Sequence, residues 1–263
     1  MTAFNMENLN TLILRIFLLS SLLLFKVSYS HSNEAVEVTQ IEFTGADGFK
    51  LVSDYYKFSD QSPSVFILHD CSRVSAVYSD LAKSIASQGW NVLQLDMRGY
   101  GRSISDEFSH KDIKSDVSDI LHYQAVLDKL KVNWSEDVLK VYKEFWGKQS
   151  LPQPISLISF GCNVATAIDL ASKVSLKSHV IITPKLTREY REAYKQLEDI
   201  PSFYVASVHH TQSYLLSKEL FDWNGDNRSR LLILKENSAG TGLLENKREL
   251  QEEIKLWLIG NQN

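Results

Sequence analysis

Apolar runs divide the chain from residue 36 onward into predicted strands. Val36–Phe43 and Phe49–Tyr56 alternate apolar and polar positions on either side of the turn residues Gly45 to Gly48, which predicts an antiparallel hairpin. Six later runs are short and continuously apolar, as expected of strands buried on both faces of a parallel sheet. These runs are Ser64–Leu68, Asn91–Leu95, Ile155–Ser159, Val180–Ile182, Phe203–Ala206 and Leu231–Leu234.

Segments with helical spacing separate these strands. Tyr78, Leu81 and Ile85 follow one such pattern, and Leu244–Leu258 is the clearest. Strands and helices that alternate after an N-terminal antiparallel hairpin predict an α/β fold with a mostly parallel central sheet and helices on both faces. Ligands of such sheets bind at the carboxyl ends of the strands, so the polar residues that end each strand are the candidates for function.

The residues around those strand ends form four characteristic stretches: ADGFKLVSDYY, SVFILHDCS, WNVLQLDMRGYGRS and ISLISFGCNVA. Together, over residues 40 to 260, they resemble the α/β-hydrolase superfamily, most closely its dienelactone hydrolase and serine esterase branch. It implies an α/β-hydrolase fold in which a serine nucleophile occupies a sharp turn between a strand and a helix. Ser159 is the residue that we expect in that position.

The resemblance also implies an oxyanion hole, which would stabilise a negatively charged reaction intermediate. The loop that supplies one of its donors is His69 to Ser72 here, and we expect Asp70, Cys71 and Phe160 to line that side of the pocket. Asp70 replaces the usual glycine, and a carboxylate there would oppose the charge of the oxyanion. His69 ends a strand, where we expect it to support the loop.

The base and the acid of a catalytic triad are missing from their usual places. A serine hydroxyl needs an imidazole to take its proton, and the imidazole needs an acid to orient it. The loop after the last strand contains no histidine and has Ala239 at the position of the base. His209 and His210 stand where the acid would be, so either could act as a displaced base for Ser159. No metal site is expected, because the two histidines have no third ligand nearby in the sequence.

The two cysteines, Cys71 and Cys162, lie in loops that are neighbours in the family fold. In an exported protein they could form a disulfide. Two buried thiols are the other possibility, because cysteine is often a small buried residue. The sequence leaves both open.

Composition and charge narrow the class of protein. The chain has 263 residues, of which 44% are hydrophobic and 23% charged, as is typical of a globular protein. A net charge of -4 provides no basic surface for nucleic acid, so we expect no nucleic-acid partner.

The N-terminus predicts export. Ile16–Phe25 is apolar, follows Arg15 and precedes small polar residues, which predicts a signal peptide over residues 1–30 and a single domain over residues 31–263. The apolar block is shorter than the roughly 20 residues of a spanning helix, so we expect no membrane span in the mature chain. We therefore expect the mature protein to be periplasmic or secreted. The alternative is that the N-terminal segment stays uncleaved and anchors the protein to the membrane.

The sequence therefore favours an exported protein that keeps the serine of a hydrolase without its partners. Such a protein would be a non-catalytic binding module or a very weak hydrolase, with a small molecule or an acyl compound as its ligand and no cofactor. The alternative is an active carboxylic ester hydrolase that uses Ser159 with His209 or His210. A third hypothesis is a structural partner subunit, which would expose an apolar patch, for example from Trp134 to Trp146.

Overall fold

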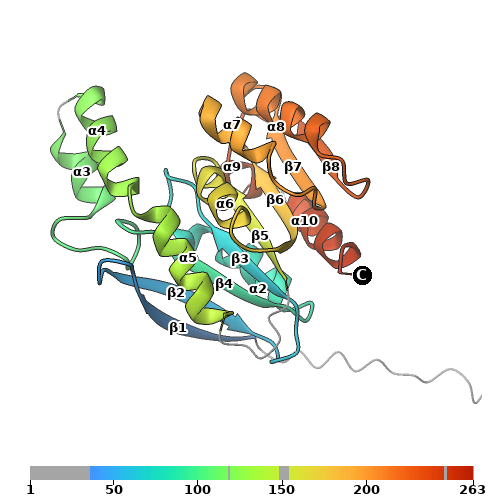
Figure 1. The fold of residues 1–263 in the computed structure, drawn as a ribbon, viewed down its shortest axis with the longest axis horizontal. Helices are drawn as coiled ribbons and strands as arrows, with labels where there is room; N and C mark the ends of the chain where they lie inside the picture. Colours follow the sequence, from blue (N-terminus) through green and yellow to red (C-terminus); the bar gives the residue numbers. More distant parts are fainter. Residues whose placement is uncertain (1–35, 118, 148–153, 246–247, 263) are drawn as a thin grey trace, which may run out of the picture. The chain divides into compact units, whose positions relative to one another are not determined.

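An eight-stranded sheet organises the part of the chain that the computed structural model describes, residues 36–117, 119–147, 154–245 and 248–262 (Figure 1). The strand order is β1-β2-β4-β3-β5-β6-β7-β8. The strands are β1 (Glu37–Thr44), β2 (Lys50–Lys57), β3 (Ser64–Leu68), β4 (Asn91–Asp96), β5 (Ile155–Phe160), β6 (Leu176–Ile182), β7 (Ser202–Ser207) and β8 (Arg230–Leu234). The predicted signal peptide lies outside the described residues.

The sheet is parallel except at its N-terminal edge. β2 pairs antiparallel with both β1 and β4, and all other neighbours are parallel. Every residue of β4, β5 and β7 is buried, which explains their continuous apolar runs. The predicted mostly parallel sheet with an antiparallel hairpin is therefore confirmed. β6 begins at Leu176, earlier than predicted, because the buried polar residues Ser178 and His179 interrupt its apolar pattern.

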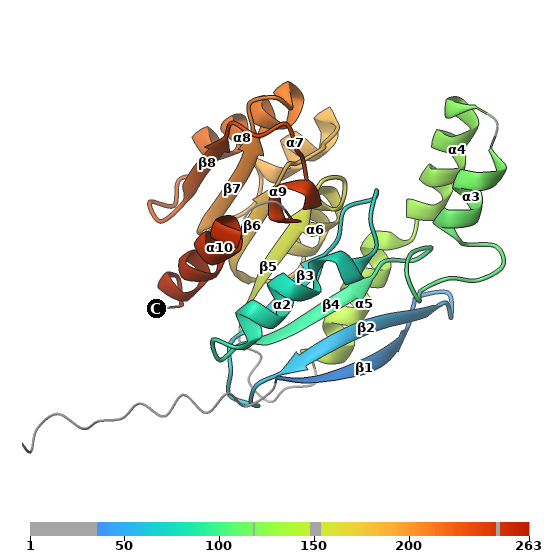
Figure 2. The same ribbon diagram turned by 180° about the vertical axis from the view of Figure 1, so that it is seen from behind.

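Helices cover both faces of the sheet (Figure 2). One face carries α2 (Ser79–Ala86), α9 (Thr241–Glu245) and α10 (Arg248–Gly260), which share a hydrophobic cluster with the central strands. The opposite face carries α5 (Trp134–Phe145), α6 (Asn163–Ala171), α7 (Arg188–Tyr194) and α8 (Thr211–Trp223). The remaining elements are a 3-10 turn η1 (Ser75–Tyr78), α3 (His110–Asp116) and α4 (Ile120–Lys131). None of the helices in the described ranges is both long and apolar enough to cross a membrane.

Alternation along β3 shows how the two faces are built. Val65 and Ile67 pack toward α2 and α10, whereas Phe66 and Leu68 pack toward α5 and α6. α5 belongs to this core, because Trp134 and Trp146 at its two ends are each only 2% exposed. The segment suggested as an apolar patch for a partner subunit is thus part of the interior.

A buried arginine joins the N-terminal hairpin to α5. Arg98 is fully buried and donates hydrogen bonds to both oxygens of Asp47 and both oxygens of Asp137, with its guanidinium 4.3 Å from the ring centre of Phe49. The hydrogen bonds from Arg98 hold the pKa of Asp47 far below its usual value. Burial raises the pKa of Asp137. The ion pairs fix the loop after β4, which lies beside the candidate site.

Candidate functional site

The turn between β5 and α6 is formed by Gly161 and Cys162. Gly161 has φ of +55°, a left-handed conformation that is strained for any residue with a side chain. Its N–H donates to the carbonyl of Ile182 and its carbonyl accepts from the N–H of Lys185, both at 3.0 Å. The residue in the sharp turn from strand to helix is therefore Gly161.

Ser159 lies two residues earlier, inside β5. It pairs with Leu68 on one side and Ile181 on the other, and it is fully buried. Its Oγ lies 2.7 Å from Nε2 of His179 in β6. Burial lowers the pKa of His179 to about 3, so this imidazole is neutral at pH 7 and a weak base. The expectation that Ser159 itself stands in the turn differs from the structure, which places it in the core.

A shift of two residues in the motif accounts for this difference. The position of the turn aligns Ser159 with the first glycine of the family pattern Gly-x-Ser-x-Gly, Gly161 with the serine and Asn163 with the second glycine, so none of the three family residues is kept. The sequence contained one signal for that register. Gly161 is the residue there with no Cβ, and the turn requires a left-handed residue.

His69 supports the loop after β3, as expected. Its Nδ1 lies 2.9 Å from the carbonyl oxygen of Asp70, and its Nε2 accepts the N–H of Met97 at 3.0 Å. With Nε2 as an acceptor, the ring carries its proton on Nδ1 and is neutral. Burial lowers the pKa of His69, which favours the same neutral form. Both ring nitrogens are thus occupied in holding this loop against the end of β4.

Asp70 fills the space in front of Gly161. The residue is only 4% exposed, and its Oδ1 accepts the N–H of Ser72 at 2.8 Å and the hydroxyl of Ser72 at 2.6 Å. A Cβ added to Gly161 would overlap Oδ2 of Asp70. The carboxylate of Asp70 therefore occupies the volume that a side chain in the turn would need.

A second left-handed glycine approaches the same carboxylate. Gly240, the residue after Ala239, has φ of +54° and donates its N–H to Oγ1 of Thr183 at 3.0 Å. A Cβ at Gly240 would lie 3.8 Å from Oδ2 of Asp70. We call Asp70, Gly161 and Gly240 the turn site. It combines two residues without side chains and one carboxylate.

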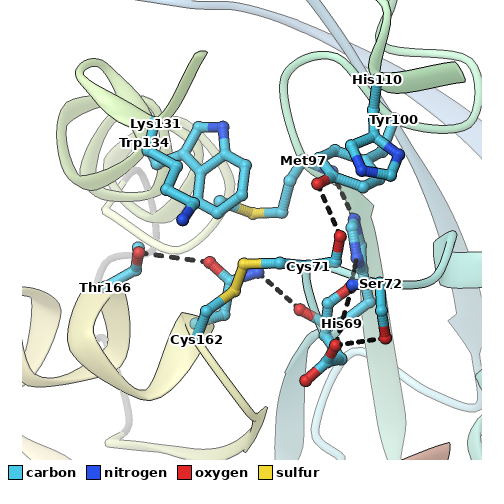
Figure 3. Close-up of a disulfide and its surroundings, with 12 residues drawn as sticks. His69, Cys71, Ser72, Met97, Tyr100, His110, Lys131, Trp134, Cys162 and Thr166 are labelled. Atoms are coloured by element: carbon cyan, nitrogen blue, oxygen red, sulfur yellow. Dashed lines mark hydrogen bonds between the residues drawn. A yellow bond between two sulfur atoms is a disulfide. The ribbon is translucent and has the colours of Figure 1, made fainter. Parts of the chain in front are cut away.

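A disulfide between Cys71 and Cys162 ties the loop after β3 to the start of α6 (Figure 3). The two Cα atoms are 5.9 Å apart, within the usual range for a disulfide. The loop is held further by the hydroxyl of Tyr100, which donates to the carbonyl of Cys71 at 2.6 Å, and by the amide of Asn163, which donates to the carbonyl of His69. Of the two possibilities that the sequence left open, the disulfide is present.

The remaining sequence-predicted residues lie away from the turn site. His209 is exposed and His210 precedes α8, at the end of a strand that β6 separates from β5. Two strand spacings correspond to about 10 Å across the sheet, and neither histidine contacts Ser159 in the described part of the chain. Phe160 is fully buried, with its ring centre 4.2 Å from that of Tyr78 in the core. The described residues contain no group of three or more His, Cys, Asp or Glu side chains that could hold a metal ion.

Comparison with known proteins supports the fold. No protein-family model and no curated protein sequence matches the chain. The solved structures that it resembles include a dienelactone hydrolase from Anabaena variabilis, with TM-score 0.62, 9% identity and coverage of 86% of this chain and 98% of that one. A predicted CIB-like hydrolase from Thermoplasma acidophilum has TM-score 0.61, 16% identity and coverage of 84% and 99%. A Pyrococcus furiosus esterase has TM-score 0.55, 16% identity and coverage of 85% and 92%. With the sheet order, these similarities show that the chain has the α/β-hydrolase fold.

Proposed function

We propose that this chain is an exported α/β-hydrolase-fold protein that binds a ligand or a partner without hydrolysing it. The observation that carries the proposal is the position of the Asp70 carboxylate, which fills the space in front of Gly161. In this fold, that turn is where a nucleophile would be presented to a substrate.

Each component of acyl transfer is affected at the turn site. Gly161 offers no nucleophile, and neither Ala239, the expected position of the base, nor Gly240, which approaches Asp70, offers an imidazole. Losing either component costs a serine hydrolase several orders of magnitude in rate. The nearby carboxylate of Asp70 would also repel the negative charge of a tetrahedral intermediate, which an active site must stabilise. The three effects act in the same direction, against catalysis.

The Cys71–Cys162 disulfide supports the proposed export, because structural disulfides persist mainly in oxidising compartments outside the cytosol. The disulfide also links the loop that carries Asp70 to the turn that contains Gly161. A covalent link at this point favours a permanent arrangement of the turn site.

The structure gives little support to an active hydrolase based on Ser159. Its hydroxyl is fully buried and is engaged by His179, whose pKa of about 3 makes it an inefficient base at neutral pH. His209 and His210 lie on a different strand end, beyond hydrogen-bond reach of this hydroxyl.

The proposal is tested by treating the purified protein with a fluorophosphonate probe and a short p-nitrophenyl ester. We expect no labelling, and ester hydrolysis equal to that of the Ser159→Ala variant. A matched positive control combines Asp70→Gly, Gly161→Ser and Gly240→His, which clears the space and installs a nucleophile and a base. We expect this triple variant to react with the probe.

Labelling of the unmodified protein that disappears in Ser159→Ala would overturn the proposal, because it would require an accessible, activated Ser159. Labelling that survives Ser159→Ala would also contradict it, and peptide mapping would then identify the nucleophile.

A further inference from the structure

A cavity lies at the amino ends of strands β6 and β7, whereas the turn site lies at the carboxyl ends of the strands. Its volume is about 250 Å³. Its walls come from the segment between α6 and β6, from the residues that follow α7 and from Asn224 at the end of α8. The proposed loss of catalysis makes no use of this cavity.

The cavity contains a buried imidazole with one unused nitrogen. His179 lines the cavity, although only 2% of its surface is exposed. Its Nε2 lies 2.7 Å from Oγ of Ser159, and its Nδ1 has no partner among the described residues. In the neutral tautomer that carries its proton on Nε2 and donates it to Ser159, Nδ1 is an acceptor. Burial lowers the pKa of His179 to about 3, so the ring is neutral and adds no positive charge. A ligand group can therefore hydrogen-bond to Nδ1 without meeting a cation.

The charged side chains on the walls have a negative balance. Glu198 and Asp199 lie on one wall, and Lys173 is the single cationic residue of the described lining. Two carboxylates against one ammonium leave one net negative charge. None of the three forms an ion pair within the described ranges, so the carboxylates are available to a ligand.

Three helix ends add to this negative potential. α6 ends at Ala171, α7 ends at Tyr194 and Asn224 directly follows α8, and all three residues line the cavity. Figure 1 shows α6, α7 and α8 along the same face of the sheet. The C-terminus of a helix carries the equivalent of about half a negative charge, which attracts cations. Helices that connect parallel strands run antiparallel to those strands. The C-termini of these helices therefore lie together at the amino ends of the strands.

The other wall residues favour an organic cation over a metal ion. Val174, Leu176, Leu197 and Ile200 give the cavity an aliphatic side. The described residues around the cavity form no cluster of side chains suited to a metal ion. The cavity volume lies just below the range of about 300 to 1,000 Å³ that is usual for drug-sized ligands, which points to a small compound.

We propose that this cavity is a binding site for a small organic cation, an alkyl ammonium or guanidinium compound. Its N–H groups donate hydrogen bonds to Nδ1 of His179 and to the carboxylates of Glu198 and Asp199. Its alkyl part lies against the aliphatic wall that includes Leu197 and Ile200.

The test is isothermal titration of the purified full chain with putrescine and with agmatine. Butanediol is the neutral control of the same chain length, and succinate is the anionic control. We expect the two cations to bind and both controls to give no heat. Glu198→Gln and Asp199→Asn should each weaken binding by about tenfold, because each removes a charge-assisted hydrogen bond. Glu37→Gln, on the distant edge strand β1, should leave the affinity unchanged.

His179 also contacts Ser159 in the core, so a substitution would change more than the cavity, and the role of His179 in binding is read in the unmodified protein. In spectra of the protein with ¹⁵N-labelled histidine, the Nδ1 signal of His179 should shift on titration with putrescine. The proposal is wrong if neither cation binds at millimolar concentration, if butanediol binds as tightly as putrescine, or if both carboxylate variants keep the original affinity. These outcomes are independent of probe labelling at a serine, so the two proposals fail separately.

Discussion

The clearest physical test of the turn site is to add one methyl group at Gly161. In the unmodified protein, Gly161→Ala should destabilise the fold by two effects. An alanine in the left-handed conformation costs about 1 to 2 kcal/mol. Its Cβ would also overlap the buried carboxylate of Asp70, and overpacking of this kind typically costs about 1 to 3 kcal/mol more.

The same substitution in an Asp70→Gly background separates the two effects. Without the Asp70 side chain, the methyl group has no described atom nearer than 3.6 Å, and only the conformational cost of about 1 to 2 kcal/mol remains. The difference between the two backgrounds, about 1 to 3 kcal/mol, is the coupling energy between positions 70 and 161. The hydrogen bonds that Asp70 makes with Ser72 are absent from both members of the second pair, so they cancel.

The free energy of unfolding of all four proteins is measured by urea titration, with tryptophan fluorescence as the signal and the disulfide intact. The comparison requires the slope of this free energy against urea concentration to be the same in all four. Gly48→Ala is the matched control. Gly48 has φ of +87°, but a Cβ at this position would meet nothing within 4 Å, so its cost should be the same in both backgrounds. If Gly161→Ala destabilises both backgrounds equally, Asp70 does not fill the space in front of Gly161, and the structural argument against catalysis is refuted.

Three further predictions concern the groups that hold the fold. Arg98→Met should destabilise by about 3 to 5 kcal/mol in urea unfolding, because it leaves the Asp137 carboxylate buried without its partner; a loss below about 1 kcal/mol would contradict this. His179 has a pKa of about 3 in the folded protein and about 6.5 in an unfolded chain, so between these pH values only the unfolded chain binds the proton. The free energy of unfolding is therefore unaffected by His179 above pH 6.5 and decreases as the pH falls from 6.5 toward 3. His179→Gln should therefore flatten the decline of stability between pH 6 and 4 by up to about 1.4 kcal/mol per pH unit, and an unchanged slope would be the contrary result. Replacing Cys71 and Cys162 by serine should cost about 4 to 5 kcal/mol, since the disulfide joins residues 91 positions apart, and an unchanged urea midpoint would show that it contributes nothing.

Patterns within short stretches of sequence predicted the fold. The hairpin pattern and the continuous apolar runs located the eight strands of the described sheet, because a strand buried on both faces must be apolar at successive positions. The prediction failed where a buried strand contains polar residues, as at Ser178 and His179. The predicted helical pattern over residues 244–258 is confirmed for the described residues, which belong to α9 and α10.

The sequence by itself determined which residues follow each strand. The loop after β3 begins with His69, the turn after β5 contains Gly161, and the loop after β8 contains no histidine. Only the tertiary structure decided which residues meet. Gly161 stands in the turn and Ser159 pairs with His179 because the pairing of β5 with β6 sets the register, and a motif that has lost its defining residues does not specify it. Asp70, Gly161 and Gly240 are distant in sequence, and the helix ends around His179 come from three separate crossovers. Such contacts depend on how whole elements pack, which consecutive residues do not encode.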